Sequence, residues 1–205
     1  DTAGLLAYDQ VTGSLYGYGY YGAGGLAGNN TGEILGGFFS GSVYEGHLIY
    51  IGGLVGANQA SGLIRNSSSA GSIPNGYQAG GLAGENEGDI LDSSSSIMIG
   101  SGYPRYIGGL VGGLLGNISR SYASGTISSP ASSYAGGFIG ATSDAGGKIT
   151  DVYAVGFVNS ANGLVGEYAG DRGGIYSGAY WDTDTSGTNY SYQGKPESDT
   201  AMKGS

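Results

Sequence analysis

The feature that most constrains this chain is a pair of glycines that returns every 28 residues. Five pairs share that spacing: Gly24-Gly25, Gly52-Gly53, Gly80-Gly81, Gly108-Gly109 and Gly136-Gly137. A sixth copy, Asn162-Gly163, follows after 26 residues. Self-similarity at one fixed period is typical of repeat architectures, in which each repeat is one structural unit and neighbouring units bury each other's apolar faces.

Two sets of apolar residues keep step with the glycine pairs. A large apolar residue follows each pair, at Leu26, Leu54, Leu82, Leu110, Phe138 and Leu164. Further on, each repeat has an aliphatic residue followed nine residues later by another, as at Ile34 and Val43. The first members of these aliphatic pairs are Ile34, Ile64, Ile90, Ile118 and Ile149. The intervening loops vary in length while these spacings do not, so we predict that the apolar positions are core strands.

These columns predict an all-β fold, a parallel β-solenoid of about six to seven coils with a 28-residue repeat. Coils stacked about 4.8 Å apart place equivalent residues above one another and turn the apolar columns into a core. Side chains alternate between the two faces of a strand, so two inward residues at an odd separation require a bend between them. We expect that bend at the glycines two positions before the second aliphatic residue: Gly41, Gly71, Gly125 and Gly156.

The repeat divides the chain into three parts. Residues 1–22 are predicted to form a degenerate N-terminal capping coil, residues 23–181 the solenoid repeats, and residues 182–205 a polar C-terminal cap or tail. Terminal coils have to cover sheet edges that would otherwise pair with other chains. Neither the first segment, residues 3–22, nor the last, residues 175–181, carries a proline or a run of charge that would block stacking, so end-to-end association is open to this chain.

The composition excludes several other classes of protein. Glycine supplies 46 of the 205 residues, but 4 prolines and the lack of a triplet period exclude collagen. The net charge of −9 disfavours nucleic acid as a partner, because phosphate binding depends on Lys and Arg. No run of about 18 apolar residues indicates a transmembrane segment. Without cysteine the chain has neither disulfides nor thiolate metal sites.

Two segments resemble a known family. Gly52-Gly53-Leu54-Val55-Gly56 and residues 118–127, which read Ile-Ser-Arg-Ser-Tyr-Ala-Ser-Gly-Thr-Ile, are similar to the GLUG repeat. The resemblance covers residues 23–181, with Ile97 standing where other copies have glycine, and residues 180–187 resemble the segment that commonly closes such arrays. GLUG repeats occur in large secreted bacterial proteins, including filamentous adhesins and non-catalytic parts of immunoglobulin A metallopeptidases. The resemblance implies a secreted or cell-surface protein whose repeats attach or space and carry no catalytic residues.

One polar column has two interpretations. Asparagine occupies the same position in three consecutive repeats, at Asn30, Asn58 and Asn86. Stacked asparagines form an amide ladder, whereas turn asparagines adopt a left-handed conformation and bond their own backbone. We interpret these three residues as turns.

A column of tyrosines is the candidate ligand-binding site. Tyrosine precedes the glycine pair at Tyr50, Tyr106 and Tyr134, and Tyr77 adjoins Gln78 in the remaining copy. Exposed tyrosines offer a large binding area to a sugar or a protein at small entropic cost. In the alternative, neighbouring rings only stack on each other and cover the core.

The segment Asp182-Thr183-Asp184-Thr185-Ser186-Gly187 copies the opening of a calcium-binding loop, with oxygens at Asp182, Asp184 and Ser186. The twelfth position is Gln193 where a glutamate is required, and no flanking helix is evident. We therefore prefer a hydrogen-bonded turn in the cap, with calcium as the alternative and no other cofactor expected.

Catalytic arrangements have little support in the sequence. The single histidine, His47, is expected in a loop, and the acidic cluster around Gly88 reads as a solvated turn. That cluster consists of Glu85, Glu87, Asp89 and Asp92. A partial serine column that would suit ice binding is interrupted by Gly37 and Val152; its members are Ser67, Ser93 and Ser121.

The sequence thus favours a non-catalytic extracellular adhesin or structural spacer, with a surface glycan or protein as its partner. The alternative is a self-assembling filament subunit whose terminal coils stack end to end with other copies. A carbohydrate-active enzyme is a third and weaker hypothesis.

Overall fold

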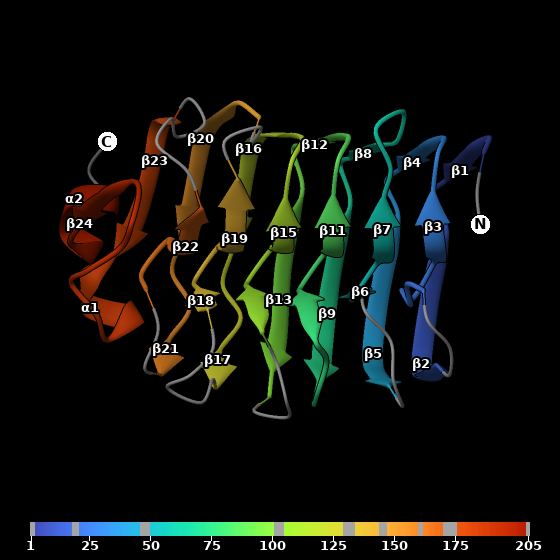
Figure 1. The fold of residues 1–205 in the computed structure, drawn as a ribbon, viewed down its shortest axis with the longest axis horizontal. Helices are drawn as coiled ribbons and strands as arrows, with labels where there is room; N and C mark the ends of the chain where they lie inside the picture. Colours follow the sequence, from blue (N-terminus) through green and yellow to red (C-terminus); the bar gives the residue numbers. More distant parts are fainter. Residues whose placement is uncertain are drawn as a thin grey trace.

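The computed structural model is a β-solenoid whose coils stack along the long axis of the molecule, from the N-terminus at one end to the C-terminus at the other (Figure 1). The structure describes residues 3–17, 21–45, 50–100, 105–128, 134–143, 147–159, 162–169 and 176–203. Two short helices, α1 (Thr183–Ser186) and α2 (Asp199–Lys203), follow the last coil. Neither these nor any other helix in the described ranges has the length and apolar character needed to cross a membrane.

Two sheets lie on either side of the glycine pairs. The strands of the first end at the first glycine of a pair: β6 (Tyr50–Gly52), β10 (Gln78–Gly80), β14 (Tyr106–Gly108) and β18 (Tyr134–Gly136). The strands of the second begin shortly after a pair: β3 (Ala27–Asn30), β7 (Val55–Asn58), β11 (Ala83–Asn86), β15 (Val111–Leu114), β19 (Ile139–Ser143) and β22 (Val165–Ala169). All pairings are parallel, and Ala79 pairs with Ile51 and Ile107, each 28 residues away.

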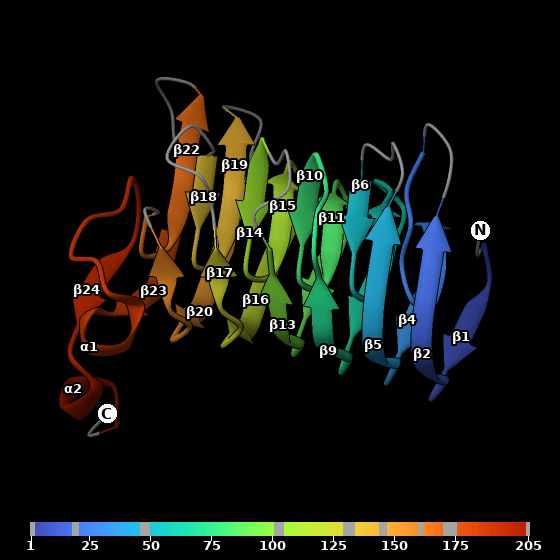
Figure 2. The ribbon, with the colours of Figure 1, turned by 90° about the horizontal axis from the view of Figure 1, so that it is seen from below.

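The third sheet has 14 strands and bends into two legs. The first leg contains β1 (Leu5–Ala7), β4 (Glu33–Leu35), β8 (Leu63–Arg65) and β12 (Asp89–Leu91). The second leg contains β2 (Gln10–Gly17), β5 (Phe38–Glu45), β9 (Ser68–Ile73), β13 (Ser94–Ile99), β17 (Ile127–Ser128) and β21 (Val158–Asn159). Its four long strands, β2, β5, β9 and β13, lie side by side in Figure 2. Three strands run through the bend: β16 (Asn117–Ala123), β20 (Ile149–Ala154) and β23 (Tyr176–Asp182). The last strand of the sheet, β24 (Lys195–Glu197), pairs with β23.

The predicted fold class is confirmed: the chain is an all-β parallel solenoid with a repeat of about 28 residues. It has about five turns, fewer than the predicted six to seven. The difference lies at the ends, because β1, β2, β23 and β24 belong only to the 14-stranded sheet. The terminal segments therefore add strands to one sheet without closing a turn.

A column of left-handed residues forms the bend between the two legs. These residues have φ between 46° and 63° and are Tyr8, Gly36, Asn66, Asp92, Arg120, Asp151 and Gly178. The bend allows both Ile64 and Ser67, on either side of Asn66, to point into the core. The predicted bend at Gly41, Gly71, Gly125 and Gly156 is wrong, because inward and outward residues keep alternating through these positions, as from Ser69 to Ile73 and from Ala123 to Ile127. The strands are interrupted at Gly125 and Gly156 but do not change face there.

Glycine is required where backbone packs directly on backbone. A Cβ atom at Gly80 would lie 1.8 Å from a carbonyl oxygen of the following strand, and one at Gly41 would lie 1.8 Å from the carbonyl oxygen of Gly13. Between the two facing sheets, a Cβ at Gly84 would lie 2.4 Å from the amide nitrogen of Ile51. All three distances are far inside van der Waals contact. The glycine columns thus mark the closest contacts between strands.

The aliphatic columns form the core. The predicted core residues that are fully buried are Leu54, Leu82, Leu110, Phe138, Leu164, Ile34, Ile64, Ile90, Ile118 and Ile149. Leu26 is only partly buried, because the segment before it closes no complete coil over it. Each fully buried aliphatic side chain stabilises the fold by about 1.5–3 kcal/mol relative to exposure. Ile97, which replaces a glycine of the repeat, is fully buried as well.

The three asparagines form a buried amide ladder. The Nδ2 of Asn30 donates to the Oδ1 of Asn58 at 2.7 Å, and the Nδ2 of Asn58 donates to the Oδ1 of Asn86 at 2.7 Å. Each also donates to a carbonyl in the turn of its own coil, as Asn30 does to Gly32 at 3.2 Å. None of the three has a positive φ, so their interpretation as left-handed turns is wrong, although they do bond their own turns. The ladder ends at Asn86 because the next strand has Leu114 in that register.

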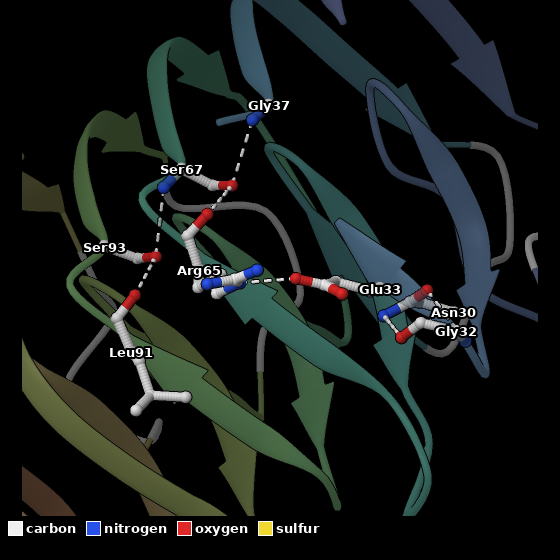
Figure 3. A network of polar contacts seen from close by, with 8 residues as sticks. All are labelled: Asn30, Gly32, Glu33, Gly37, Arg65, Ser67, Leu91 and Ser93. Carbon is white, nitrogen blue, oxygen red and sulfur yellow. Dashed lines mark hydrogen bonds and ion pairs between the residues drawn. The ribbon is translucent and has the colours of Figure 1, made fainter. Parts of the chain in front are cut away.

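A second ladder of serine hydroxyls runs along the bend. The Oγ of Ser93 accepts the amide of Ser67 at 3.2 Å and donates to the carbonyl of Leu91 at 2.7 Å (Figure 3). The same pair of bonds recurs at the neighbouring serines Ser67 and Ser121. All three serines are buried, so this column offers no surface to ice or to any other ligand.

Replacing the central asparagine tests the amide ladder. Asn58→Ala leaves the Oδ1 of Asn86 without its donor and takes the Oδ1 acceptor away from the Nδ2 of Asn30, in a buried site. We expect the free energy of unfolding to fall by about 3 kcal/mol, the cost of buried groups left unpaired, as measured by denaturant unfolding. Asn117→Ala, which removes an exposed asparagine, is the control and should cost less than about 1 kcal/mol. Equal losses from the two variants would contradict the ladder's structural role.

Candidate functional site

The predicted tyrosine row lies at the start of the strands of the four-stranded sheet. Tyr50, Tyr106 and Tyr134 open β6, β14 and β18, and Gln78 opens β10 between the first two. The rings of Tyr106 and Tyr134 stack with their centroids 5.7 Å apart and their planes inclined by 18°. Gln78 is buried and separates Tyr50 from this stack. The row is therefore one stacked pair and one separate tyrosine.

Arg105 connects Tyr77 to the stacked pair. Its Nη1 donates a hydrogen bond of 3.0 Å to the hydroxyl of Tyr77, and its guanidinium carbon lies 5.1 Å from the centre of the Tyr106 ring. Tyr77 and Tyr134 remain exposed. These contacts fit the interpretation that the rings cover one another, while ligand binding by the row stays a prediction.

Tyr50 takes part in a small polar cluster with Glu85 and Gln78. Burial raises the pKa of Glu85 above its ordinary value of 4.5; hydrogen bonds with Tyr50 and Gln78 act against this rise, and the charge of Glu87 adds to it. Burial and the same Glu85 carboxylate raise the pKa of the Tyr50 hydroxyl. The folded protein therefore holds the Glu85 proton more tightly than the unfolded chain does, and ionised Glu85 destabilises it.

This cluster predicts a pH-dependent gain in stability for Glu85→Gln. The wild-type contribution is complete below pH 4.5, the ordinary value, and is lost as the pH rises through the raised pKa. Glutamine keeps a hydrogen-bonding side chain without the buried charge, so thermal unfolding at neutral pH should shift upward by a few degrees at most. The gain should vanish in acid. Glu87→Gln, which removes the same charge from an exposed position, is the control; an equal gain there would contradict the burial argument.

The predicted calcium loop caps a helix. Asp182 is buried, and its carboxylate accepts hydrogen bonds of 2.9 Å from the amide of Asp184 and from the hydroxyl of Thr185 at the start of α1. The carboxylate of Asp184 accepts the amide of Asp199 at 3.0 Å, which connects α1 to α2. Ser186 is also buried and bonds within the same turn. The arrangement is that of an N-cap; calcium binding stays a prediction, tested by whether calcium changes the melting temperature.

The described residues after β23 cover one end of the solenoid. The carbonyl of Tyr190 accepts the amide of Gly163 at 2.9 Å, and the hydroxyl of Ser191 accepts the amides of Leu164 and Val165 at 3.1 and 2.9 Å. β24 adds a further strand beside β23. At the opposite end, β1 and β2 are the last strands of the two legs within the described part of the chain. The two ends of the molecule therefore differ.

Of the four acidic residues considered for catalysis, Glu85 lies on β11 of the six-stranded sheet and Glu87 directly after that strand, whereas Asp89 lies on the first leg of the large sheet and Asp92 at its bend. The two carboxylate oxygens of Asp92 accept hydrogen bonds of 2.6 and 2.7 Å from Arg120, and this contact holds the pKa of Asp92 below its usual range. Asp89 accepts a 2.8 Å bond from Asn117, and Arg65 pairs with Glu33 on the neighbouring strand (Figure 3). His47 lies outside the described residues. Across the described ranges, no group of three or more His, Cys, Asp or Glu side chains is placed to hold a metal ion.

The second leg has a different outer surface, which the sequence reasoning missed. We call this surface the serine face and define it as four outward-facing columns: Gln10, Phe38, Ser68, Ser94, Tyr122 and Tyr153; Thr12, Ser40, Ala70, Ser96, Ser124 and Val155; Ser14, Ser42, Ser72, Met98, Thr126 and Phe157; and Tyr16 and Tyr44. None of these residues is charged. The alternation of serine with inward residues in β9 and β13 was the available signal, but the bend decides which residues face outward.

Two hollows interrupt the serine face and its continuation towards the cap. A groove of about 200 Å³ lies between Phe38 and Tyr122, over the serines of β9 and β13. A cavity of about 330 Å³ lies between Tyr153, Tyr180 and the helix α2. The rings of Tyr122 and Tyr153 stack with centroids 5.0 Å apart and planes inclined by 3°, and so form a ridge between the two hollows.

Comparison with known proteins identifies the repeat. The family described as "The GLUG motif" matches residues 47–73 and 103–128. Each matched segment corresponds to one coil, the first ending with β9 and the second with β17. No curated protein matches the chain. The chain is thus a β-solenoid that carries the GLUG motif at two positions.

Proposed function

We propose that this chain is a non-catalytic adhesive or spacer module that works outside the cell and presents one side of a rigid solenoid to a surface glycan or protein. The observation that carries the proposal is the serine face, where strands from successive coils expose hydroxyl and aromatic groups without charge. In a chain with a net charge of −9, none of the residues that form the serine face is charged. The GLUG motif at residues 47–73 and 103–128 supports the proposal, because the resemblance to that family implies a secreted protein.

Rigidity is the second property that such a module needs. The asparagine and serine ladders connect successive coils through buried hydrogen bonds, in addition to the backbone pairing of three sheets. Buried and fully paired polar networks fix one arrangement, because each broken bond leaves an unpaired group. We therefore expect the support of the serine face to keep its arrangement when a ligand binds.

A filament subunit is the second candidate, and the unpaired edge of β2 favours it. Endless stacking needs two open ends, however, and at the other end residues 190–192 bond to residues 163–165, where the next coil would have to pair. Association through β2 alone would close as a two-fold pair of molecules.

Adhesion and assembly are tested on the same preparation. We expect analytical ultracentrifugation to show a monomer that does not depend on concentration, and beads coated with the protein to attach to at least one surface of immobilised polysaccharide, mucin or matrix protein. Beads coated with heat-denatured protein are the control. Attachment to none of these surfaces would contradict the adhesive role. Polymers whose size grows with protein concentration would make the filament the better proposal.

A further inference from the structure

The groove on the serine face arises from the sizes of stacked residues. In the column that contains it, two serines on neighbouring strands, Ser68 and Ser94, lie between the rings of Phe38 and Tyr122. Three strand steps of about 4.8 Å separate the two rings, so the walls stand roughly 14 Å apart at the backbone. Two small residues between two large ones leave a slot across the coils.

One wall of the groove is a rigid aromatic surface. The ring of Tyr122 is stacked on Tyr153, one strand further along, and this covers one of its faces. The opposite face is directed towards Ser94, the partner of Tyr122 on the preceding strand. Tyr122 is 39% exposed and lines the groove, so this face is accessible. A ring held in place by a parallel neighbour loses little entropy when a ligand packs against it.

The floor of the groove carries hydroxyl groups that are free to bind. Within the described residues, the hydroxyls of Ser68 and Ser94 make no hydrogen bond. Ser96 and Ser124, further along the strands, make only bonds of 3.4 Å to backbone carbonyls. A serine hydroxyl both donates and accepts, and so matches a sugar hydroxyl in either sense.

We propose that this groove binds one pyranose ring of a neutral glycan chain. A sugar ring in van der Waals contact with the Tyr122 ring lies about 4 Å from it. The sugar ring then lies above Ser94, because Ser94 is one strand step of about 4.8 Å from Tyr122. The apolar face of the sugar packs on Tyr122, its hydroxyl edge meets Ser94 and Ser68, and the chain continues along the strands over Ser96. An anionic sugar is excluded because none of the residues of the serine face supplies a cation for its charge. This inference names the ligand of the proposed adhesive surface and rests on that proposed function.

Two variants test the groove in opposite ways. Tyr122→Ala removes the aromatic wall, and Ser94→Tyr fills the slot with a ring that extends the existing stack. In titration calorimetry with neutral oligosaccharides of glucose, galactose and mannose, we expect at least one to bind and each variant to weaken it by about tenfold or more, equivalent to about 1.4 kcal/mol. Ser94→Tyr should not lower the melting temperature, so its loss of binding cannot come from unfolding. Tyr16→Ala and Ser14→Tyr, the matched changes elsewhere on the serine face, should leave affinity unchanged.

Four results would overturn the proposal: no binding of any neutral oligosaccharide, stronger binding of the sulfated counterparts, wild-type affinity in Ser94→Tyr, or equal losses in the matched controls. The bead assay separates this inference from the proposed function. If beads coated with the Ser94→Tyr variant attach as well as wild-type beads do, the adhesive role is supported and glycan binding in the groove is contradicted. If a soluble glycan binds in the groove but coated beads attach to no surface, the groove proposal is supported and the adhesive role is contradicted.

Discussion

Direct contact between the backbones of adjacent strands is the constraint on which the rest of this structure depends. At the glycine pairs and at the glycines of the facing sheets, a single Cβ atom would overlap a neighbouring backbone atom. The coils therefore stack in one register, because a shift along the chain would bring a side chain to a place where only glycine fits. The 28-residue period in the sequence is the consequence of that register.

Once the register is set, every position of the repeat becomes a column, and the chemistry of each column follows from where it faces. Inward aliphatic columns make the core. Inward asparagines and serines form hydrogen bonds with the asparagines and serines of the neighbouring coils. Outward side chains on the first leg form ion pairs and hydrogen bonds with side chains on neighbouring strands. On the second leg they expose hydroxyls and rings, and a binding groove needs only two small members between two large ones.

The fold was predictable because the 28-residue period of the glycine pairs and the constant spacing of the apolar residues can be read directly from the sequence. The bend was not, since its left-handed column contains Tyr8, Asn66 and Arg120 as well as glycines and so has no single residue type as a signal. Asparagine serves both turns and ladders, and only its burial decides between them. The serine face depended on the bend, which determines which alternate residues point outward. The contacts of the C-terminal cap lie outside the repeat, so stacking gave no guide to them.

Cysteine cross-linking measures the register of the coils most directly, because the chain has no cysteine of its own. Ser72 and Met98 are outward-facing partners on the neighbouring strands β9 and β13, whereas Ser72 and Ser94 lie on the same two strands out of register. Stacking in this register predicts that mild oxidation forms a disulfide in the variant Ser72→Cys/Met98→Cys and not in Ser72→Cys/Ser94→Cys, since the bond requires closely spaced Cα atoms. Equal cross-linking of the two pairs, or cross-linking of the second pair alone, would contradict the stacked solenoid described above.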